Sequence, residues 1–403
     1  MKKHPDRTVA IIGGGPAGMI AAAVLADHVH VDLYEQGRNL GRKFLVAGDG
    51  GLNITNSVEG EALMAHYAPA ELLAPMLTDF GPLQLRAWLE GLGVPTFEGT
   101  SGRVFPQRGI KPAEVLKAIV DRLMAKGVSI YTGCRFVGFD EHARPTMERN
   151  EERFAPQADA FLFALGGASW PKTGSTGEWS HAFRAIGVRV EEFQASNCGV
   201  VAELPRPLHP HAGKPLKNIT VTCGAKTVRG ELTITDHGVE GNAIYPVIPE
   251  VRAQLAAMGD AEIIIDLKPD LSEERINEKL RDAAWKERMA ALRLDRPSVA
   301  LLKAYTPVQR FLDGRTFAHD LKHVRIPVQA LRPIEEAIST VGGIVMDEVN
   351  EDLSLKAHPH LFVAGEMVEW DAPTGGFLLQ GAFSTGHWAA QRIRARFGLP
   401  EQV

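Results

Sequence analysis

The sequence predicts an α/β fold built on a parallel sheet, with a second unit inserted near its middle. Three observations predict it: a strand-helix-strand pattern over residues 9–35, an antiparallel β texture over residues 200–267, and a return of strand and helix signals after residue 341. Buried parallel strands read as short apolar runs, whereas antiparallel strands are broken by Pro, Gly and Asp. We therefore expect one discontinuous domain, residues 1–191 and 339–403, interrupted by residues 192–338.

The first pattern carries a G-x-G-x-x-G motif in the sequence GGGPAG, at Gly13, Gly15 and Gly18. An apolar strand over 9–12 precedes it, an Ala-rich helix over 19–26 follows, and a strand over 29–33 leads to Glu35. Gly13 permits the turn, Gly15 lets a pyrophosphate approach the backbone, and Gly18 lets the helix close on the strand. Glu35 has the spacing of the acid that accepts ribose hydrogen bonds. This order of features predicts a dinucleotide site rather than an ordinary Gly-rich turn.

Two further glycine-rich places favour a ligand. Residues 37–56 combine many glycines with Arg42, Lys43 and Asn53, so we expect a loop that wraps a polar ligand rather than a plain surface loop. The predicted strand over 160–165 runs into Gly166 and Gly167, which marks a second close approach of backbone to ligand.

The remaining elements follow from hydrophobic spacing and turn residues. Helices are predicted over 70–93, 112–126 and 378–396, with a charged helical region over 271–313. Strands are predicted over 128–131, 134–140, 219–223, 231–235, 244–248, 263–266 and 361–366.

Composition indicates a soluble globular protein in a reducing cytoplasm. The 403 residues are 23% charged with a net charge of −5, which gives no overall attraction to nucleic acid or membrane. The three cysteines, Cys134, Cys198 and Cys223, are far apart, which excludes a zinc ribbon and paired-thiol chemistry, and we expect no metal. The uncharged run over 8–26 is interrupted by glycines and is short for a bilayer. Residues 281–325 hold ten basic and five acidic side chains. The preferred interpretation is a solvated helical face, and the alternative is a surface for an anionic partner.

Six motifs together make the sequence resemble a known family. Its landmarks are GGGPAG at 13–18, GRKFLVAGDGGLNITNS at 41–57, GRVFP at 102–106, LGGASWPKTGSTG at 165–177, HGVEGNAIY at 237–245 and LFVAGEMVEWDAPTGGFLLQGAFSTG at 361–386. In this order they are similar to FAD-binding flavoproteins of the aminoacetone oxidase family, which includes a bile-acid pathway reductase and a ribosomal RNA dihydrouridine synthase. The resemblance implies a glutathione-reductase-like FAD domain, a β-barrel-like insert over 192–270 and 320–338, and a small helical insert over 271–319.

The resemblance also assigns cofactor positions. The GGGPAG turn would hold the pyrophosphate, Glu35 the adenosine ribose and Val137 the adenine. Residues 42, 43 and 53 would line the cofactor loop, the glycine pair at 166–167 would border the cofactor, and residues 365–366 would face its phosphate or ribityl part. Residues 375–377 would place a helix N-terminus against the flavin ring. The implied set is Gly13, Gly15, Pro16, Ala17, Gly18, Glu35, Arg42, Lys43, Asn53, Val137, Gly166, Gly167, Gly365, Glu366, Gly375, Gly376 and Phe377.

No single acid or base stands out from the sequence. The chain has Gly51-Leu52 where many relatives carry Arg-Cys, so it does without that cysteine, and Asn197-Cys198 replaces an apolar-proline stretch. Trp370 has two readings: it stacks over a flat substrate, or it packs its own loop. The candidates for catalysis are Lys43, Asn197, Trp370 and Asp371, followed by Asn53, Cys198, His237, Tyr245 and Glu366.

The predicted function is transfer of a hydride between FAD and a small or planar unsaturated substrate. Two alternatives stay open: reduction of a uridine in ribosomal RNA, with the basic stretch holding phosphates, and a non-catalytic flavin-binding protein. The chain has no second nucleotide motif for NAD(P)H. Either NADH or NADPH binds transiently at the flavin as reductant, or the substrate itself supplies the electrons. Oligomeric state is left open.

Overall fold

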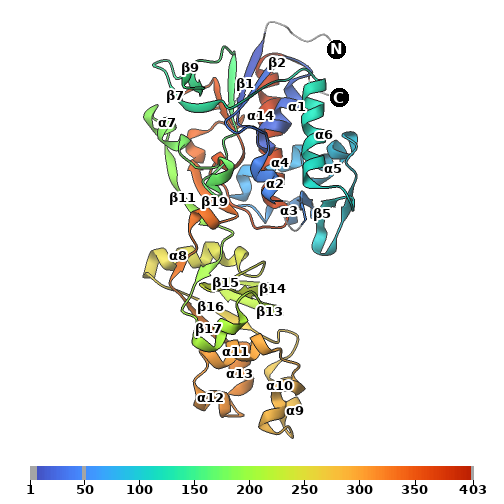
Figure 1. The fold of residues 1–403 in the computed structure, drawn as a ribbon, viewed down its shortest axis with the longest axis vertical. Coiled ribbons are helices and arrows are strands. Elements are labelled where there is room, and N and C mark those ends of the chain that lie inside the picture. The colour runs from blue at the N-terminus through green and yellow to red at the C-terminus, as the bar shows by residue number, and fades with distance from the viewer. Residues whose placement is uncertain (1–6, 48–50, 401–403) are drawn as a thin grey trace. The chain divides into compact units, whose positions relative to one another are not determined.

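The computed structural model describes residues 7–47 and 51–400, and the chain divides into two units (Figure 1). Unit 1 comprises Met1–Gln194 and Ser339–Val403, and unit 2 comprises Ala195–Ile338. Each unit has its own hydrophobic core. Among the described residues, no helix combines the length and apolar character needed to cross a bilayer.

Unit 1 is built on a five-stranded parallel sheet in the order β20-β10-β1-β2-β6. At its centre, Ile11 of β1 lies opposite Leu162 of β10 on one side and Leu33 of β2 on the other. The strands β1, β10 and β20 are apolar and almost fully buried, as expected for parallel strands covered on both faces. This arrangement confirms the predicted α/β fold with a Rossmann-like parallel sheet. The bounds are β1 Thr8–Ile12, β2 His30–Glu35, β6 Ser129–Thr132, β10 Ala160–Phe163 and β20 Leu361–Val363.

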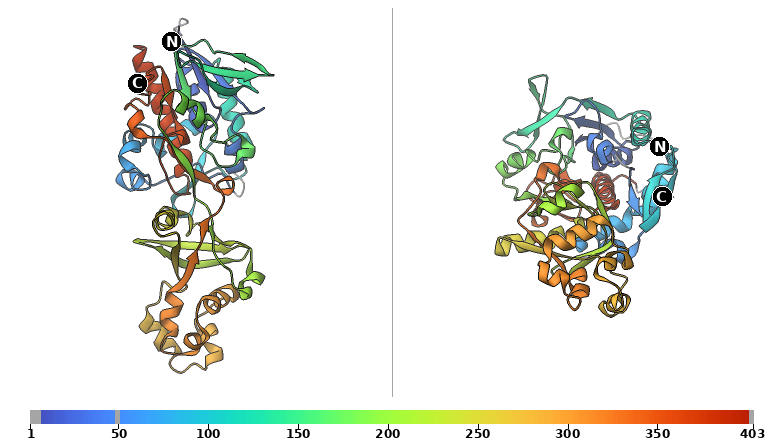
Figure 2. Two further views of the ribbon diagram at one scale, coloured as in Figure 1. Left: turned by 90° about the vertical axis from the view of Figure 1, so that its left-hand side faces the viewer. Right: turned by 60° about the horizontal axis from the view of Figure 1, so that its bottom comes forward.

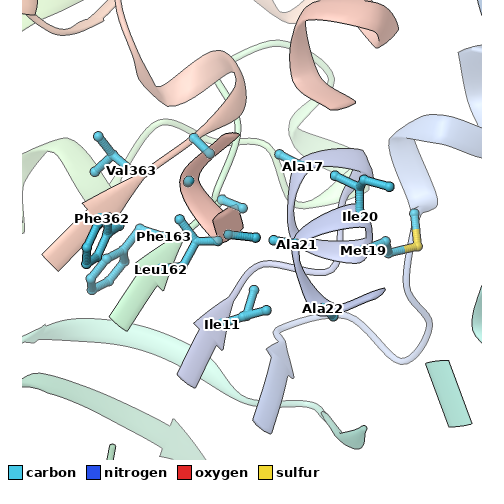
Figure 3. Packing of buried hydrophobic residues seen from close by; sticks show 14 of the residues in the cluster. Ile11, Ala17, Met19, Ile20, Ala21, Ala22, Leu162, Phe163, Phe362 and Val363 are labelled. Carbon is cyan, nitrogen blue, oxygen red and sulfur yellow. The ribbon is translucent and has the colours of Figure 1, made fainter. Parts of the chain in front are cut away.

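Helix α1 (Pro16–Leu25) packs against this sheet and against the long C-terminal helix α14 (Phe377–Arg396). The two helices lie side by side in Figures 1 and 2. Small residues make α1 narrow enough for this position, since Ala21 and Ala22 are fully buried. A Cβ on Gly386 of α14 would lie only 2.2 Å from the carbonyl oxygen of Ala17. Figure 3 shows α1 side chains meeting those of β1, β10 and β20 in one core. Helices α1 and α14, from the N-terminal and C-terminal parts of the chain, are therefore packed closely against each other.

The other elements of unit 1 extend this core. Two three-stranded sheets have the orders β3-β5-β4 and β7-β8-β9, and β11 pairs with β19. The helix bounds are α2 Arg42–Ala47, α3 Gly60–Met64, α4 Ala70–Asp79, α5 Pro82–Gly91, α6 Pro112–Ala125 and α7 Trp179–Ala185. The strand bounds are β3 Thr55–Asn56, β4 Thr96–Glu98, β5 Arg103–Pro106, β7 Arg135–Phe139, β8 Pro145–Arg149, β9 Glu152–Phe154, β11 Val190–Ser196 and β19 Ser339–Ile344.

Unit 2 holds a seven-stranded sheet in the order β17-β16-β13-β14-β15-β12-β18, with antiparallel pairs throughout. Helix α8 lies on one side of it and helices α9–α13 lie on the other (Figure 2). The strand bounds are β12 Val200–Val201, β13 Pro215–Cys223, β14 Lys226–Ile234, β15 Gly238–Glu240, β16 Ala261–Asp266, β17 Val324–Val328 and β18 Ala330–Leu331. The helix bounds are α8 Ile248–Met258, α9 Glu273–Leu280, α10 Arg288–Ala291, α11 Arg296–Tyr305, α12 Val308–Leu312 and α13 Phe317–Lys322.

Three predicted elements differ in the structure. The helix predicted over 70–93 is two helices, because the chain breaks at Phe80 and restarts with Pro82 at the first position of α5. The strand predicted over 244–248 is wrong, since these residues form a helical turn that leads into α8, with Pro249 in its first turn. The loop predicted over 37–56 contains helix α2, and its residues 48–50 lie outside the described residues.

We predict that Gly386→Ala destabilises unit 1. The added Cβ would meet backbone atoms of Ala17, and these cannot turn away as the end of a flexible side chain can. The expected loss in the free energy of unfolding is about 1–3 kcal/mol, measured by urea denaturation. Gly91→Ala, at the end of α5, is the matched control, because its Cβ meets nothing within 4 Å. Equal stability of the two variants would contradict the close contact between α1 and α14.

Candidate functional site

The turn between β1 and α1 gives its three motif glycines different surroundings. A Cβ on Gly13 would lie 2.2 Å from the oxygen of Ala164, and a Cβ on Gly18 would lie 2.0 Å from the oxygen of Gly13. A Cβ on Gly15 would meet no described atom within 4 Å. Gly13 and Gly18 thus close the turn on the protein, while Gly15 borders open space where a ligand can reach the backbone.

Helix α1 directs its N-terminus at the same open space. Gly15 is its N-cap, Pro16 is its first residue, and its first turn carries no acidic side chain. The first helical hydrogen bond runs from Met19 N–H to Gly15 O at 2.9 Å. The N–H groups of Ala17 and Gly18 come before this bond and have no acceptor within the helix. A helix end of this kind attracts anions through its N–H groups and its dipole. The turn therefore fits the pyrophosphate of FAD.

Glu35 lies at the end of β2, beside this turn. Its Oε2 accepts a hydrogen bond from Gly14 N–H at 2.9 Å, and its Oε1 accepts one from Gly37 N–H at 2.6 Å. The two bonds fix the carboxylate in orientation and leave lone pairs for further donors. Ribose hydroxyls are such donors, so the position fits the expectation that Glu35 binds the adenosine ribose.

A polar network surrounds Lys43, which lies on α2. Its Nζ donates to Ser169 Oγ at 2.7 Å and to Glu366 Oε2 at 2.9 Å. The other oxygen of Glu366 accepts hydrogen bonds from Thr340 N–H at 2.8 Å and from Thr340 Oγ1 at 3.2 Å. Gly167 permits this arrangement, because a Cβ there would lie 2.0 Å from Thr340 Oγ1. Four distant segments of the chain therefore meet at one ion pair.

Four other expected cofactor positions have distinct surroundings. Asn53 Oδ1 is buried without a hydrogen-bond partner among the described residues, an arrangement that fits a donor from a ligand. Val137 lies where the register between β7 and β8 shifts, so its backbone is outside the regular pairing. Arg42 donates from Nη2 to the carbonyl oxygen of Lys172 at 2.5 Å. The carbonyl of Gly166 accepts from the Trp179 indole at 2.9 Å.

The start of α14 is held by β3. Gly376 is its N-cap with φ +96°, and a Cβ there would lie 2.4 Å from the backbone of Thr55. Asn56 Nδ2 donates to Gly375 O at 3.2 Å. Thr55 Oγ1 donates to Oε1 of Gln380, a fully buried side chain, at 2.6 Å. The N-terminus of α14 is thus fixed by three contacts with one strand.

Sequence reasoning missed several residues at this helix start. The ring of His66 stacks on that of Phe377 at 4.1 Å between centroids, and Tyr67 Oη donates to Phe377 O at 2.8 Å. Gln380 Nε2 donates to Phe80 O at 2.9 Å. A glutamine one turn into an apolar helix is the signal that could have predicted a buried polar partner.

Two of the residues proposed for catalysis lie in the loop before α14. Trp370 is 3% exposed, and its indole N–H donates to Gly365 O at 2.9 Å. Its ring packs against Gly381, whose Cβ would lie 2.8 Å away, so the observed geometry matches the packing interpretation. Asp371 is buried, exchanges two backbone hydrogen bonds with Ala68, and accepts Ala372 N–H on Oδ1 at 2.9 Å.

The remaining candidates lie in unit 2. Asn197 is buried with φ +51°, and its carbonyl accepts the N–H of Ile338 at 3.2 Å. Burial raises the pKa of Tyr245 to about 12, with a further contribution from Glu240, so its hydroxyl stays neutral at physiological pH. His237 lines a pocket of about 340 Å³ with Glu240, Arg332 and other residues of the sheet.

Burial raises the pKa of two of the three thiols. It raises the pKa of Cys223 to about 11 and also raises the pKa of Cys134. Because thiolate is the reactive form, we predict that a disulfide reagent at pH 8 leaves both unlabelled in the native protein. After unfolding in urea, all three cysteines should react, as located by mass spectrometry. Rapid labelling of Cys223 in the native protein would show that this thiol is accessible or ionised.

Comparison with known proteins identifies relatives along the whole chain. The chain is 24% identical over 413 residues to the 3-dehydro-bile acid delta(4,6)-reductase of Clostridium scindens, covering 96% of this chain and 99% of that protein. It is 28% identical over 245 residues to the ribosomal RNA dihydrouridine synthase of Haemophilus influenzae, covering 59% and 60%. The Escherichia coli protein of the same name is 23% identical over 408 residues, covering 96% and 97%.

One solved structure and one family model complete the comparison. The fold is similar to 3-ketosteroid delta1-dehydrogenase from Sterolibacterium denitrificans, with a TM-score of 0.54, 14% identity, and coverage of 97% of this chain and 100% of that one. The family model described as the HI0933-like protein Rossmann domain matches residues 7–392. The resemblance to FAD-binding flavoproteins drawn from the sequence is confirmed. Because the match spans nearly the whole chain, this protein belongs to the HI0933-like Rossmann-domain family.

Proposed function

We propose that this protein is an FAD-dependent oxidoreductase that transfers a hydride between the flavin and a small or planar unsaturated substrate. The observation that carries the proposal is the turn at Gly15, where the backbone borders open space beside an α-helix N-terminus and the fixed carboxylate of Glu35. When bound, FAD supplies the two-electron chemistry. The residues of the chain supply binding, orientation and charge.

Each part of the site has a distinct role in this proposal. The α1 N-terminus binds the pyrophosphate, and Glu35 accepts hydrogen bonds from the adenosine ribose. Asn53 and the backbone of Val137 bind other parts of the cofactor, as the sequence landmarks imply. The N-terminus of α14, held by Thr55, directs its dipole toward the flavin and favours negative charge there.

Lys43 and Glu366 are proposed to orient the ribityl region of the cofactor and to place a positive charge near it. Their side chains are 29% and 18% exposed, so the pair is shielded more than a surface ion pair. Glu366 is also held by two hydrogen bonds from Thr340. The pair is therefore rigid enough to fix a ligand group.

The names of the relatives support an unsaturated substrate. The Clostridium scindens name denotes reduction of double bonds in a bile acid, and the name of the Haemophilus influenzae and Escherichia coli proteins denotes addition of two hydrogens to uridine. Both are reductions of a double bond in a ring. The ribosomal RNA substrate is the second candidate, and the basic stretch over 281–325 favours it. Several of those charges are paired within the protein, including Arg310 with Asp320 and Arg325 with Glu262, so we rank it second.

We predict opposite behaviour for two glycine substitutions in the turn. Gly15→Val places its side chain in the open space, so the apoprotein should keep its unfolding temperature while FAD retention falls at least tenfold. Gly18→Val instead collides with the carbonyl of Gly13 and should lower the unfolding temperature. FAD is measured by its absorbance per protein chain, and stability by thermal unfolding without added cofactor. Retention of FAD by Gly15→Val would overturn the placement of the pyrophosphate.

Anaerobic stopped-flow mixing of the yellow protein tests the reaction itself. We expect NADH or NADPH to bleach the flavin, and an unsaturated steroid or a uridine-containing RNA to restore the colour, which distinguishes the two substrate classes. Lys43→Met should retain FAD but slow the bleaching at least tenfold, because a positive charge beside the cofactor is lost. Lys172→Met is the matched control, since only the backbone carbonyl of Lys172 takes part in the site. A flavin that no reductant bleaches would indicate a non-catalytic protein.

A further inference from the structure

One cluster outside the cofactor site combines two imidazoles and a carboxylate. Glu273 lies in the first turn of α9, His319 lies on α13, and His323 is the C-cap of α13. Each residue offers one ligand atom, and these atoms all lie within 4.8 Å of one another. We propose that these residues bind a divalent transition-metal ion of the zinc type, which would link α9 to α13 in unit 2.

The distances are close to those that a metal requires. His319 Nδ1 lies 3.1 Å from Glu273 Oε1, and His323 Nδ1 lies 3.9 Å from the same oxygen. Ligand atoms about 2.0–2.1 Å from a tetrahedral Zn²⁺ lie roughly 3.3 Å from one another. Small side-chain rotations are therefore enough to bring all three groups onto one ion.

The local backbone arranges the two histidines. Residues four apart on a helix share a face, and the two rings stack with centroids 4.2 Å apart and planes at 21°. His323 Nδ1 also lies 2.9 Å from the carbonyl oxygen of His319. A carbonyl can only accept, so Nδ1 carries a proton in the metal-free protein, and the ring of His323 must turn to present a nitrogen lone pair to the ion.

The surroundings allow an ion to enter. The side chains of His319, Glu273 and His323 are 52%, 37% and 38% exposed. The ammonium group of Lys322, between the two histidines in sequence, is bound to Asp266 Oδ2 at 2.5 Å. Three protein ligands leave one position for water, the arrangement of an open site. Imidazole with carboxylate favours Zn²⁺, Ni²⁺ or Cu²⁺ over Mg²⁺ and Ca²⁺. The sequence-based expectation of no metal rests on the spacing of the cysteines, and this cluster contains no cysteine.

The test measures Zn²⁺ binding to the full-length, tag-free protein after removal of metals with a chelator. Isothermal titration should show one equivalent of Zn²⁺ in the wild-type protein that is absent from His319→Ala and from His323→Ala. Glu273→Gln should raise the dissociation constant at least tenfold. His209→Ala is the matched control, because this exposed histidine of unit 2 also has a ring nitrogen against a carbonyl but lies outside the cluster.

Thermal unfolding gives a second measurement. Zn²⁺ should raise the unfolding temperature of the wild-type protein and of His209→Ala, because an ion bound only to the native state stabilises it. It should leave the doubly substituted His319→Ala, His323→Ala protein unchanged. The proposal is overturned if the wild-type protein binds no Zn²⁺ at micromolar concentration, or if the double variant binds the same number of equivalents. Similar unfolding temperatures without metal will establish that the variants are folded.

Discussion

Unit 1 depends on close contact of backbone with backbone around helix α1. On one side Gly13 lies against the carbonyl of Ala164, and on the other Gly386 lies against Ala17. A side chain at either glycine would separate the layers, so the sheet, α1 and α14 can pack only with hydrogen atoms at these positions. This contact joins the N-terminal and C-terminal parts of the chain, although residues 195–338 form another unit between them.

The same contact positions the proposed cofactor site. Because α1 is held tightly at Gly18, its N-terminus has a fixed direction. Of the three motif glycines, Gly15 is the one that borders open space. Beside it, the ion pair of Lys43 and Glu366 connects α2 with the loop after β20. A site formed by a rigid helix end and a shielded ion pair holds a ligand without reorganisation, which favours both affinity and orientation.

Much of the fold could be predicted because its signals are local. Strand, glycine turn, helix, strand and acid follow one another within residues 9–35, and the structure confirms the α/β fold that they predict. The strand predicted over 244–248 failed for a physical reason: an apolar run of this length suits a buried helix start as well as a strand. Prolines at 246 and 249 favoured the helical turn, because proline fits the first turn of a helix.

The sequence by itself determined the parallel sheet and the close packing at Gly13 and Gly18, because both depend on backbone geometry set by neighbouring residues. Only the tertiary structure decided which distant side chains meet. Lys43 and Glu366 are 323 positions apart, and Thr55 and Gln380 are 325 apart. The same holds for Glu273 and His319, which are 46 apart on separate helices. No local pattern specifies such pairs, because the packing of whole elements brings them together.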